Sequence, residues 1–221
     1  MISELATPVA WKHLGRISYD DATRLQDDTW SRVVSGDAAE CIFTLEHDPV
    51  ITIGRRGEQG DVLLPEQALA ERGVTVVRAD RGGEVTYHGP GQLVIYPILN
   101  IKKRGIAVGD LVRGVAGSVN QVLAALEINA TYDGQNPGLW CDGKKICAVG
   151  MRIKKGVSRH GAAVNLSTDL SAFELIVPCG LPDSQTTSVS KLNGEAPSVA
   201  SFAADVVRVL RETFSLGAPP S

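Results

Sequence analysis

A lone thiol stands between a rigid and a permissive residue in the run Pro178-Cys179-Gly180, directly after the apolar pair Ile176-Val177. Proline fixes its own φ, and glycine lets the backbone turn sharply and approach a ligand closely. This order predicts that Cys179 lies on a tight turn at the end of a strand, where its sulfur could attack a carbonyl carbon. A buried structural cysteine is the alternative, because small buried cysteines are common.

Two amines that could serve such a thiol follow the pair Asp142-Gly143, which predicts a hairpin turn. Strand alternation would point either Lys144 or Lys145 inward, and two solvated lysines beside a turn are the alternative. A neighbouring ammonium lowers the pKa of a thiol, and the same amine can pass protons to a leaving thiol and from an attacking amine. A thiol and an amine together predict acyl transfer without ATP, since thioester exchange is nearly isoenergetic and the final amide is more stable.

Two segments with glycine and other small residues could line the site of such a reaction. The segment 81–92 holds four glycines and a proline, which predicts two turns that flank a short extended piece. It matches neither the phosphate-binding loop nor the dinucleotide fingerprint, and a plain hairpin is the alternative. The segment 159–165 leads from a His-Gly step into small side chains, which would keep the floor of an alkyl-chain cavity low.

Together these four segments resemble the signature of octanoyltransferases, also called lipoyl(octanoyl) transferases or lipoate-protein ligase B. The resemblance extends from about Ile51 to Ser188. It implies that an octanoyl group moves from octanoyl-acyl carrier protein to a lysine of a lipoyl domain. The implied acceptors are the lipoyl domains of 2-oxoacid dehydrogenase E2 subunits and the glycine cleavage H protein.

The resemblance also implies roles for single residues. The thioester nucleophile falls on Cys179, and its partner amine falls on Lys145, because the family's lysine directly precedes an Ile-x-Ala-x-Gly stretch. No metal and no cofactor are implied. One departure is Val164, where the family usually has leucine, and it keeps the lining apolar. The implied substrate-binding residues are Arg81, Gly82, Gly83, Glu84, Val85, Thr86, Tyr87, His88, Ala148, Val149, Gly150, Gly161, Ala162 and Ala163.

Three other functions remain open from the sequence. A Cys-His thiol hydrolase would use His88 or His160 as its base, and the paired lysines beside the hairpin turn argue against it. An ATP-dependent lipoate or biotin protein ligase would need no nucleophilic cysteine. A non-catalytic module that binds a carrier protein would form no covalent acyl adduct.

The elements that must position these residues predict an α+β fold. Apolar residues recur at helical spacing over 22–33, 111–126 and 202–214, and a short helix should open at Pro65. Asp110 and Ser198 are the expected N-caps. Strands outnumber helices without alternating with them, which favours a mixed, mainly antiparallel sheet with the long helices on one face and a cleft on the other. The expected strands are 10–14, 41–45, 50–53, 74–77, 93–98, 146–153 and 162–166.

Length and composition fit one globular domain. The chain has 221 residues, of which 43% are hydrophobic and 21% charged. The resemblance implies a single catalytic domain like the biotin and lipoate protein ligases, over residues 1–216, and we expect 217–221 to be a flexible tail.

Charge and cysteine content limit the partners and the cellular compartment that we expect for this protein. A net charge of −3 gives no sign of nucleic-acid binding, and no apolar run approaches the ~20 residues of a membrane span. The N-terminus does not resemble a signal peptide. The four cysteines do not suit a disulfide framework, and without a CxxC pair they do not suit a zinc site. We therefore expect a cytoplasmic protein. The basic clusters 102–104 and 152–159 are either solvated strand ends or a rim that attracts an acidic protein partner.

Overall fold

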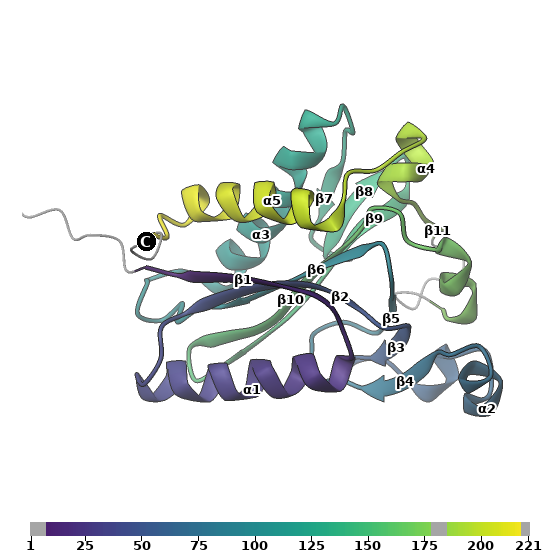
Figure 1. Cartoon of the computed structure of the whole chain (residues 1–221), viewed down its shortest axis with the longest axis horizontal. Helices are drawn as coiled ribbons and strands as arrows, with labels where there is room; N and C mark the ends of the chain where they lie inside the picture. The colour runs from purple at the N-terminus through teal and green to yellow at the C-terminus, as the bar shows by residue number, and fades with distance from the viewer. Residues whose placement is uncertain (1–7, 178–184, 218–221) are drawn as a thin grey trace, which may run out of the picture.

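The computed structural model describes residues 8–177 and 185–217, which form two sheets and the helices that cover them (Figure 1). Within these residues the larger sheet is mostly antiparallel, except that β1 runs parallel to β2 and β11 parallel to β9. This confirms the expected α+β fold with a mixed, mainly antiparallel sheet. Its strand order is β1 (Ala10–Ile17), β2 (Cys41–His47), β6 (Gln92–Ile98), β10 (Val157–Asn165), β9 (Lys144–Lys154), β8 (Gly138–Cys141) and β7 (Thr131–Asp133), with β11 (Gln185–Thr186) also beside β9.

A smaller sheet carries the glycine-rich segment to the larger one. It has three described strands, in the order β4 (Thr75–Arg78), β3 (Val50–Ile53) and β5 (Val85–His88). Three short helical elements pack near it or connect strands: η1 (Gln59–Asp61), α2 (Glu66–Ala70) and η2 (Leu170–Leu175). A fourth, α4 (Val189–Asn193), connects β11 to the last helix.

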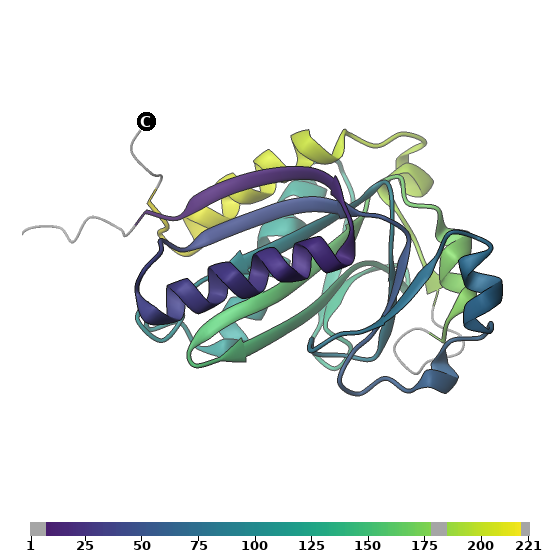
Figure 2. The same cartoon turned by 60° about the horizontal axis from the view of Figure 1, so that its bottom comes forward.

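The long helices lie on both faces of the larger sheet, so the expectation that they cover one face is wrong. Helix α1 (Tyr19–Ser35) packs on one face, and α3 (Val108–Ala125) and α5 (Val199–Thr213) pack on the other (Figures 1 and 2). The alternation of β2 shows why: Ile42 joins the core beneath α3 and α5, whereas Phe43 joins the core beneath α1. Both faces of the central strands are apolar and require cover.

The helix starts confirm some sequence signals and correct others. The Ser198 hydroxyl caps α5 by accepting a hydrogen bond from the Ser201 amide, as expected. The assignment of Asp110 as an N-cap is wrong, because α3 begins at Val108 and Asp110 lies in its first turn. Pro65 stands just before the first residue of α2 rather than within it.

The two ends of the described chain meet at the edge of the large sheet. Pro8 forms a parallel bridge with Gly217, and the Gly217 carbonyl accepts a hydrogen bond from the Val9 amide at 2.9 Å. Gly217, the first residue of the expected tail, is therefore held by backbone pairing. Residues 218–221 lie outside the described part, so the domain limits 1–216 and 217–221 stay a prediction.

A buried polar cluster joins the start of α1 to the large sheet. The His47 ring contacts the rings of Tyr19 and Tyr96, with centroid distances of 5.1 and 5.9 Å. Its Nδ1 donates to the Ile17 carbonyl at 3.3 Å, so its Nε2 accepts from the Tyr96 hydroxyl at 2.8 Å. Burial lowers the pKa of His47 to about 4, although the Ile17 hydrogen bond and the charge of Asp48 oppose the shift.

We predict that Gly161→Ala strongly destabilises the fold. An added Cβ at this position would overlap the Ile95 carbonyl oxygen of β6, which cannot move without breaking the sheet. The expected loss in the free energy of unfolding is about 1–3 kcal/mol or more, measured by urea denaturation. Gly117→Ala is the matched control: it lies exposed within α3 with open space around it and should gain roughly 0.5–1 kcal/mol. Equal stability of the Gly161 variant and wild type would contradict the close approach.

We predict that acid destabilises the protein partly through His47. Its pKa is about 4 in the folded state and 6.5 in the unfolded reference, so the unfolded chain binds an extra proton between these values. Stability is therefore present above pH 6.5 and declines as pH falls toward 4. His47→Gln should reduce the slope of unfolding free energy against pH by up to roughly 1.4 kcal/mol per unit in this window. Urea titrations at several pH values measure it, and an unchanged slope would refute the assignment.

Candidate functional site

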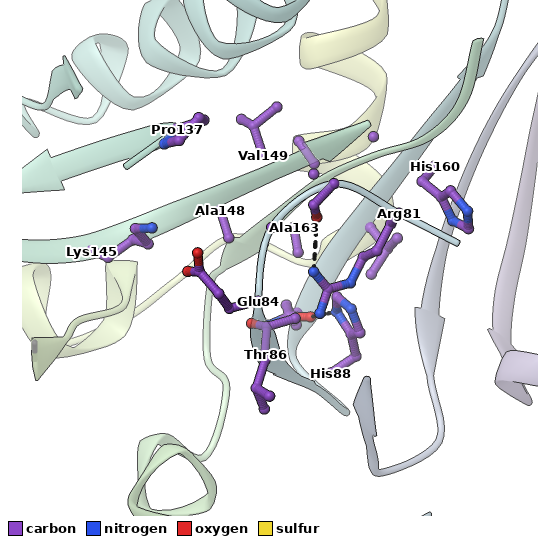
Figure 3. A pocket seen from close by; sticks show the side chains of 18 of the residues that line it. Arg81, Glu84, Thr86, His88, Pro137, Lys145, Ala148, Val149, His160 and Ala163 are labelled. Carbon is purple, nitrogen blue, oxygen red and sulfur yellow. Dashed lines mark hydrogen bonds between the residues drawn. The ribbon is translucent and has the colours of Figure 1, made fainter. Parts of the chain in front are cut away.

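A cavity of about 90 Å³ lies between strands β9 and β10 of the large sheet and the glycine-rich segment that leads into β5 (Figure 3). It brings together most of the site residues expected from the sequence, although these are far apart along the chain. Those that line it are Arg81, Gly82, Gly83, Glu84, Val85, Thr86, His88, Lys145, Ala148, Val149, Gly150, Gly161, Ala162 and Ala163.

Glycines allow the loop to lie directly on β9. The Gly82 amide donates to the Met151 carbonyl at 3.1 Å. A Cβ at Gly82 would come within 2.9 Å of that same carbonyl oxygen, and a Cβ at Gly150 within 2.8 Å of the Gly82 oxygen. Real Cβ atoms do not approach backbone this closely, so only glycine fits at both positions. The backbone contact between loop and strand fixes the height of the cavity.

Arg81 anchors the same loop to the small sheet. Its buried guanidinium donates to the Thr52 hydroxyl through Nε and Nη2 at 3.0 and 2.8 Å, and to the Thr52 carbonyl through Nη2 at 2.6 Å. Its Nη1 donates to the Gly82 carbonyl at 3.0 Å. Arg81 therefore holds the loop in shape and brings a positive charge to the wall of the cavity.

Lys145 faces the cavity and Lys144 does not line it. Cross-strand pairing puts Gly138 opposite Ala148 and Leu139 opposite Cys147, but Trp140 opposite Lys145, so Ile146 is an extra residue in β9. Such a β-bulge shifts the alternation by one residue. Ile146 and Cys147 both turn into the apolar core, and Lys145 turns to the same side as Ala148.

The surroundings of Lys145 hold its side chain along the strand. Only 8% of the residue is exposed, and its Nζ lies 4.7 Å from the centroid of the Trp140 ring, within the range of a cation–π interaction. Its Cε lies 3.3 Å from the position of a Cβ on Gly138, the cross-strand partner of Ala148. The amine is thus directed along the cavity rather than out to solvent.

The expected nucleophile, Cys179, lies outside the described residues. Both flanks of its segment are described. The Val177 amide donates to the Asp61 carbonyl at 2.8 Å, and Thr186 of β11 pairs with Lys145 and lines the cavity. The chain therefore resumes directly beside Lys145.

The other three cysteines are buried free thiols. Burial raises the pKa of Cys41 to about 11 and that of Cys147 to about 12, and it raises the pKa of Cys141 as well. Since the thiolate is the nucleophile, these three cysteines are poorly suited to attack a carbonyl.

Both histidines of the His-Gly steps line the cavity as neutral rings. Burial lowers the pKa of His88 well below its usual value and, assisted by the charges of Arg159 and Arg81, lowers that of His160 to about 3. Rings with such low pKa values are weak bases at neutral pH, which disfavours the Cys-His hydrolase.

A hydrogen-bond chain that the sequence analysis did not identify supports His88. Gln92 Nε2 donates to the Tyr87 carbonyl at 3.1 Å and to Asn165 Oδ1 at 2.9 Å, so Gln92 Oε1 accepts from His88 Nδ1 at 2.7 Å. Asn165 in turn donates to the Thr187 carbonyl at 3.0 Å. This chain ties β5, β6 and β10 to the stretch after β11.

Tyr87 departs from the expected substrate lining. In β5, Thr86 and His88 face the cavity, whereas the Tyr87 ring packs edge-on against Phe173 at 5.7 Å and lines a separate cavity of about 820 Å³. Strand alternation is the reason. Residues that line the site but were not expected include Tyr19, Arg56, Gln92, Val94, Tyr96, Asn136, Pro137, Asn165, Phe173 and Thr186.

The two basic clusters are less available than the sequence suggested. Arg104 is largely buried in an ion pair with Glu40, and Arg159 in one with Asp27. Arg152 pairs with Asp80 at 3.5 Å. The remaining lysines of both clusters are exposed, so a rim for a protein partner would rest on them: Lys102, Lys103, Lys154 and Lys155.

Within the described ranges, no group of His, Cys, Asp or Glu could hold a metal ion. Nor is any helix of that part of the chain long and apolar enough to cross a membrane.

Comparison with known proteins places this geometry in a family. The lipoyl protein ligase A/B catalytic domain matches residues 18–211. An octanoyltransferase from Chloroflexus aggregans is 42% identical over 207 residues, which cover 92% of this chain and 94% of the relative. A Thermoplasma acidophilum lipoate protein ligase shares the fold with a TM-score of 0.72 at 16% identity, over 97% of this chain and 87% of its own. A biotin protein ligase from Aquifex aeolicus has a TM-score of 0.54 at 13% identity, over 94% of this chain and 69% of its own. The fold expected from the resemblance is confirmed, and the chain belongs to the lipoyl protein ligase A/B catalytic family and, within it, to the octanoyltransferases.

Proposed function

We propose that this protein transfers an octanoyl group from octanoyl-acyl carrier protein to a lysine of a lipoyl domain through a thioester on Cys179. Membership of the octanoyltransferases supports the reaction class. The observation that carries the proposal is Lys145, turned by a bulge into a cavity whose floor is built of glycine and alanine. An apolar, low floor suits an alkyl chain, and the amine lies at one end of it (Figure 3).

In the first half-reaction, the Cys179 thiolate attacks the carbonyl carbon of the donor thioester. A new C–S bond forms, the donor C–S bond breaks, and the donor thiolate leaves with a proton from the Lys145 ammonium. In the second, the acceptor amine attacks the new thioester and forms the C–N bond. Its proton passes to the now neutral Lys145, and Cys179 leaves as thiolate. The sum is thioester plus amine giving amide plus thiol.

The state of the other thiols supports Cys179 as the nucleophile. The sequence has four cysteines, and the three described ones are buried with raised pKa values. All three are free, as in a reducing compartment, which supports a cytoplasmic setting. Lipoyl domains of 2-oxoacid dehydrogenases and the glycine cleavage H protein are the acceptors we propose.

We predict that Cys179 alone carries the acyl group. After incubation with octanoyl-acyl carrier protein and no acceptor, intact mass spectrometry should show a gain of one octanoyl group. Cys179→Ala should show none, and Cys147→Ala, which removes a buried thiol two residues from Lys145, should keep the adduct. An adduct that survives Cys179→Ala would overturn the assignment and favour another nucleophile. Transfer of free octanoate that requires ATP and survives Cys179→Ala would favour an ATP-dependent ligase.

We predict that the two neighbouring lysines differ sharply in importance. Lys145→Ala should lower kcat/KM by about 10²–10⁴-fold, the usual effect of removing a general acid and base. Lys144→Ala is the matched control and should stay close to wild type, because Lys144 does not line the cavity. Lys145→Arg should also fail, since a guanidinium cannot take up the amine's proton. Reversed losses for the two alanine variants would show that the bulge does not direct Lys145 to the reaction.

A further inference from the structure

Trp140 lies against the amine that the proposed reaction uses. The bulge in β9 places Trp140 of β8 directly opposite Lys145. Side chains of directly opposed residues lie on the same face of a sheet and contact each other. The Lys145 Nζ lies 4.7 Å from the centroid of the indole ring. Trp140 is not one of the residues that line the cavity, so an effect of its ring on the reaction would pass through Lys145.

A turn in the wall of the cavity fixes the orientation of the ring. The Trp140 Nε1 donates to the Asn136 carbonyl at 3.3 Å, and the Asn136 side chain donates to Asp133 Oδ2 at 3.2 Å. The following residue, Pro137, accepts a hydrogen bond at its carbonyl from the Val149 amide of β9 at 3.1 Å. Asn136 and Pro137 both line the cavity. The turn therefore forms part of the wall and also holds the edge of the indole ring.

A ring in this position attracts the charged form of Lys145 far more strongly than the neutral amine. The face of an aromatic ring is negative, and tryptophan binds cations best. Only 8% of Lys145 is exposed, so water screens the contact weakly. The same charge is felt in the neighbouring turn: hydrogen bonds from Gln135 and Asn136 lower the pKa of Asp133, and the charge of Lys145 adds to the effect. The strength of the contact thus depends on whether Lys145 carries its proton.

The two half-reactions change the charge of Lys145 in opposite directions. In the first, the ammonium gives up its proton, so its attraction to the ring is strongest before the transition state and does not accelerate the step. In the second, the neutral amine takes up the acceptor's proton, and positive charge develops on Nζ against the face of the ring. An interaction that is stronger in the transition state than in the ground state accelerates a step, so the ring favours the second half-reaction.

We propose that Trp140 is a positioning residue that acts through Lys145 and accelerates transfer of the acyl group from the enzyme to the acceptor amine. As the C–N bond forms and the bond to the Cys179 sulfur breaks, the proton moves from the acceptor nitrogen to the Lys145 Nζ. The ring holds this amine in place and stabilises the ammonium that forms. The inference rests on the proposed function for the two half-reactions and for the role of Lys145.

Fluorinated tryptophans, introduced at position 140 by nonsense suppression, test the electrons of the ring with little change in its size. Each added fluorine weakens the attraction of the ring for a cation. The rate of the acceptor step should therefore fall steadily along the series, by about 3- to 30-fold at tetrafluorotryptophan. Formation of the octanoyl adduct on Cys179 should change by less than about threefold. Single-turnover experiments with intact mass spectrometry measure the two rates separately.

The same series at position 30 is the matched control. The Trp30 ring has a similar contact, with the Lys154 Nζ at 5.4 Å from its centroid, but it is not among the residues that line the cavity. Fluorination there should leave both rates unchanged. Trp140→Leu, which has no aromatic face, should slow the acceptor step about as much as tetrafluorotryptophan does, and Trp140→Phe should restore part of the rate.

The outcomes separate this inference from the proposed function. Acyl transfer through the Cys179 adduct at a rate that does not respond to fluorination at position 140 would reject the role of Trp140 and leave the reaction standing. So would a larger fall in adduct formation than in the acceptor step. A wild-type protein that neither forms the adduct nor transfers octanoyl would overturn the proposed function, and this inference with it.

Discussion

The extra residue in β9 decides which lysine faces the cavity, and the chemistry that we propose depends on it. Without it, strict alternation from Ala148 would place Lys144 on the cavity face and turn Lys145 into the opposite layer. The bulge at Ile146 reverses this at small cost, because an isoleucine side chain joins the apolar core beneath α3. The parallel pairing of β11 then fixes the bulged strand from its other edge, where the Thr187 amide donates to the Lys145 carbonyl at 2.9 Å.

Direct backbone contact gives the cavity its shape. Gly82 lies on Gly150 and Met151, and Gly161 lies against Ile95, so the loop approaches β9, and β10 approaches β6, to distances that no side chain permits. These contacts also explain why small residues recur on the floor: a larger side chain there would occupy the cavity or push the loop away. Because these contacts hold the loop rigidly against the strands, the sheet rather than the loop determines where the lining side chains lie.

The sequence predicted the local features well, and the failures are those of long-range packing. Asp142 and Gly143 both have positive φ, as their residue types indicate for a two-residue hairpin. Which lysine faces the cavity could not be derived from alternation, because a bulge leaves no clear mark in residue types, and only the family resemblance selected Lys145. The ion pairs of Arg104 with Glu40 and of Arg159 with Asp27 join residues far apart in sequence, so the basic clusters looked more exposed than they are. Tyr19 contributes to the site only because α1 covers the second face of the sheet.

A cysteine at this site could use a histidine or a lysine as its acid–base partner, and burial of the histidines, with the charge of Arg81 beside them, decides between the two. The hydrogen bonds of Arg81 to the Thr52 hydroxyl and carbonyl and to the Gly82 carbonyl hold the guanidinium in the wall of the cavity. Burial is the main reason that the pKa values of His88 and His160 are lowered, and the charge of Arg81 adds to the effect at both rings. A histidine in this field cannot readily accept a proton from a thiol or an amine at neutral pH. This agrees with the acid–base role that we propose for Lys145, which the bulge turns into the cavity.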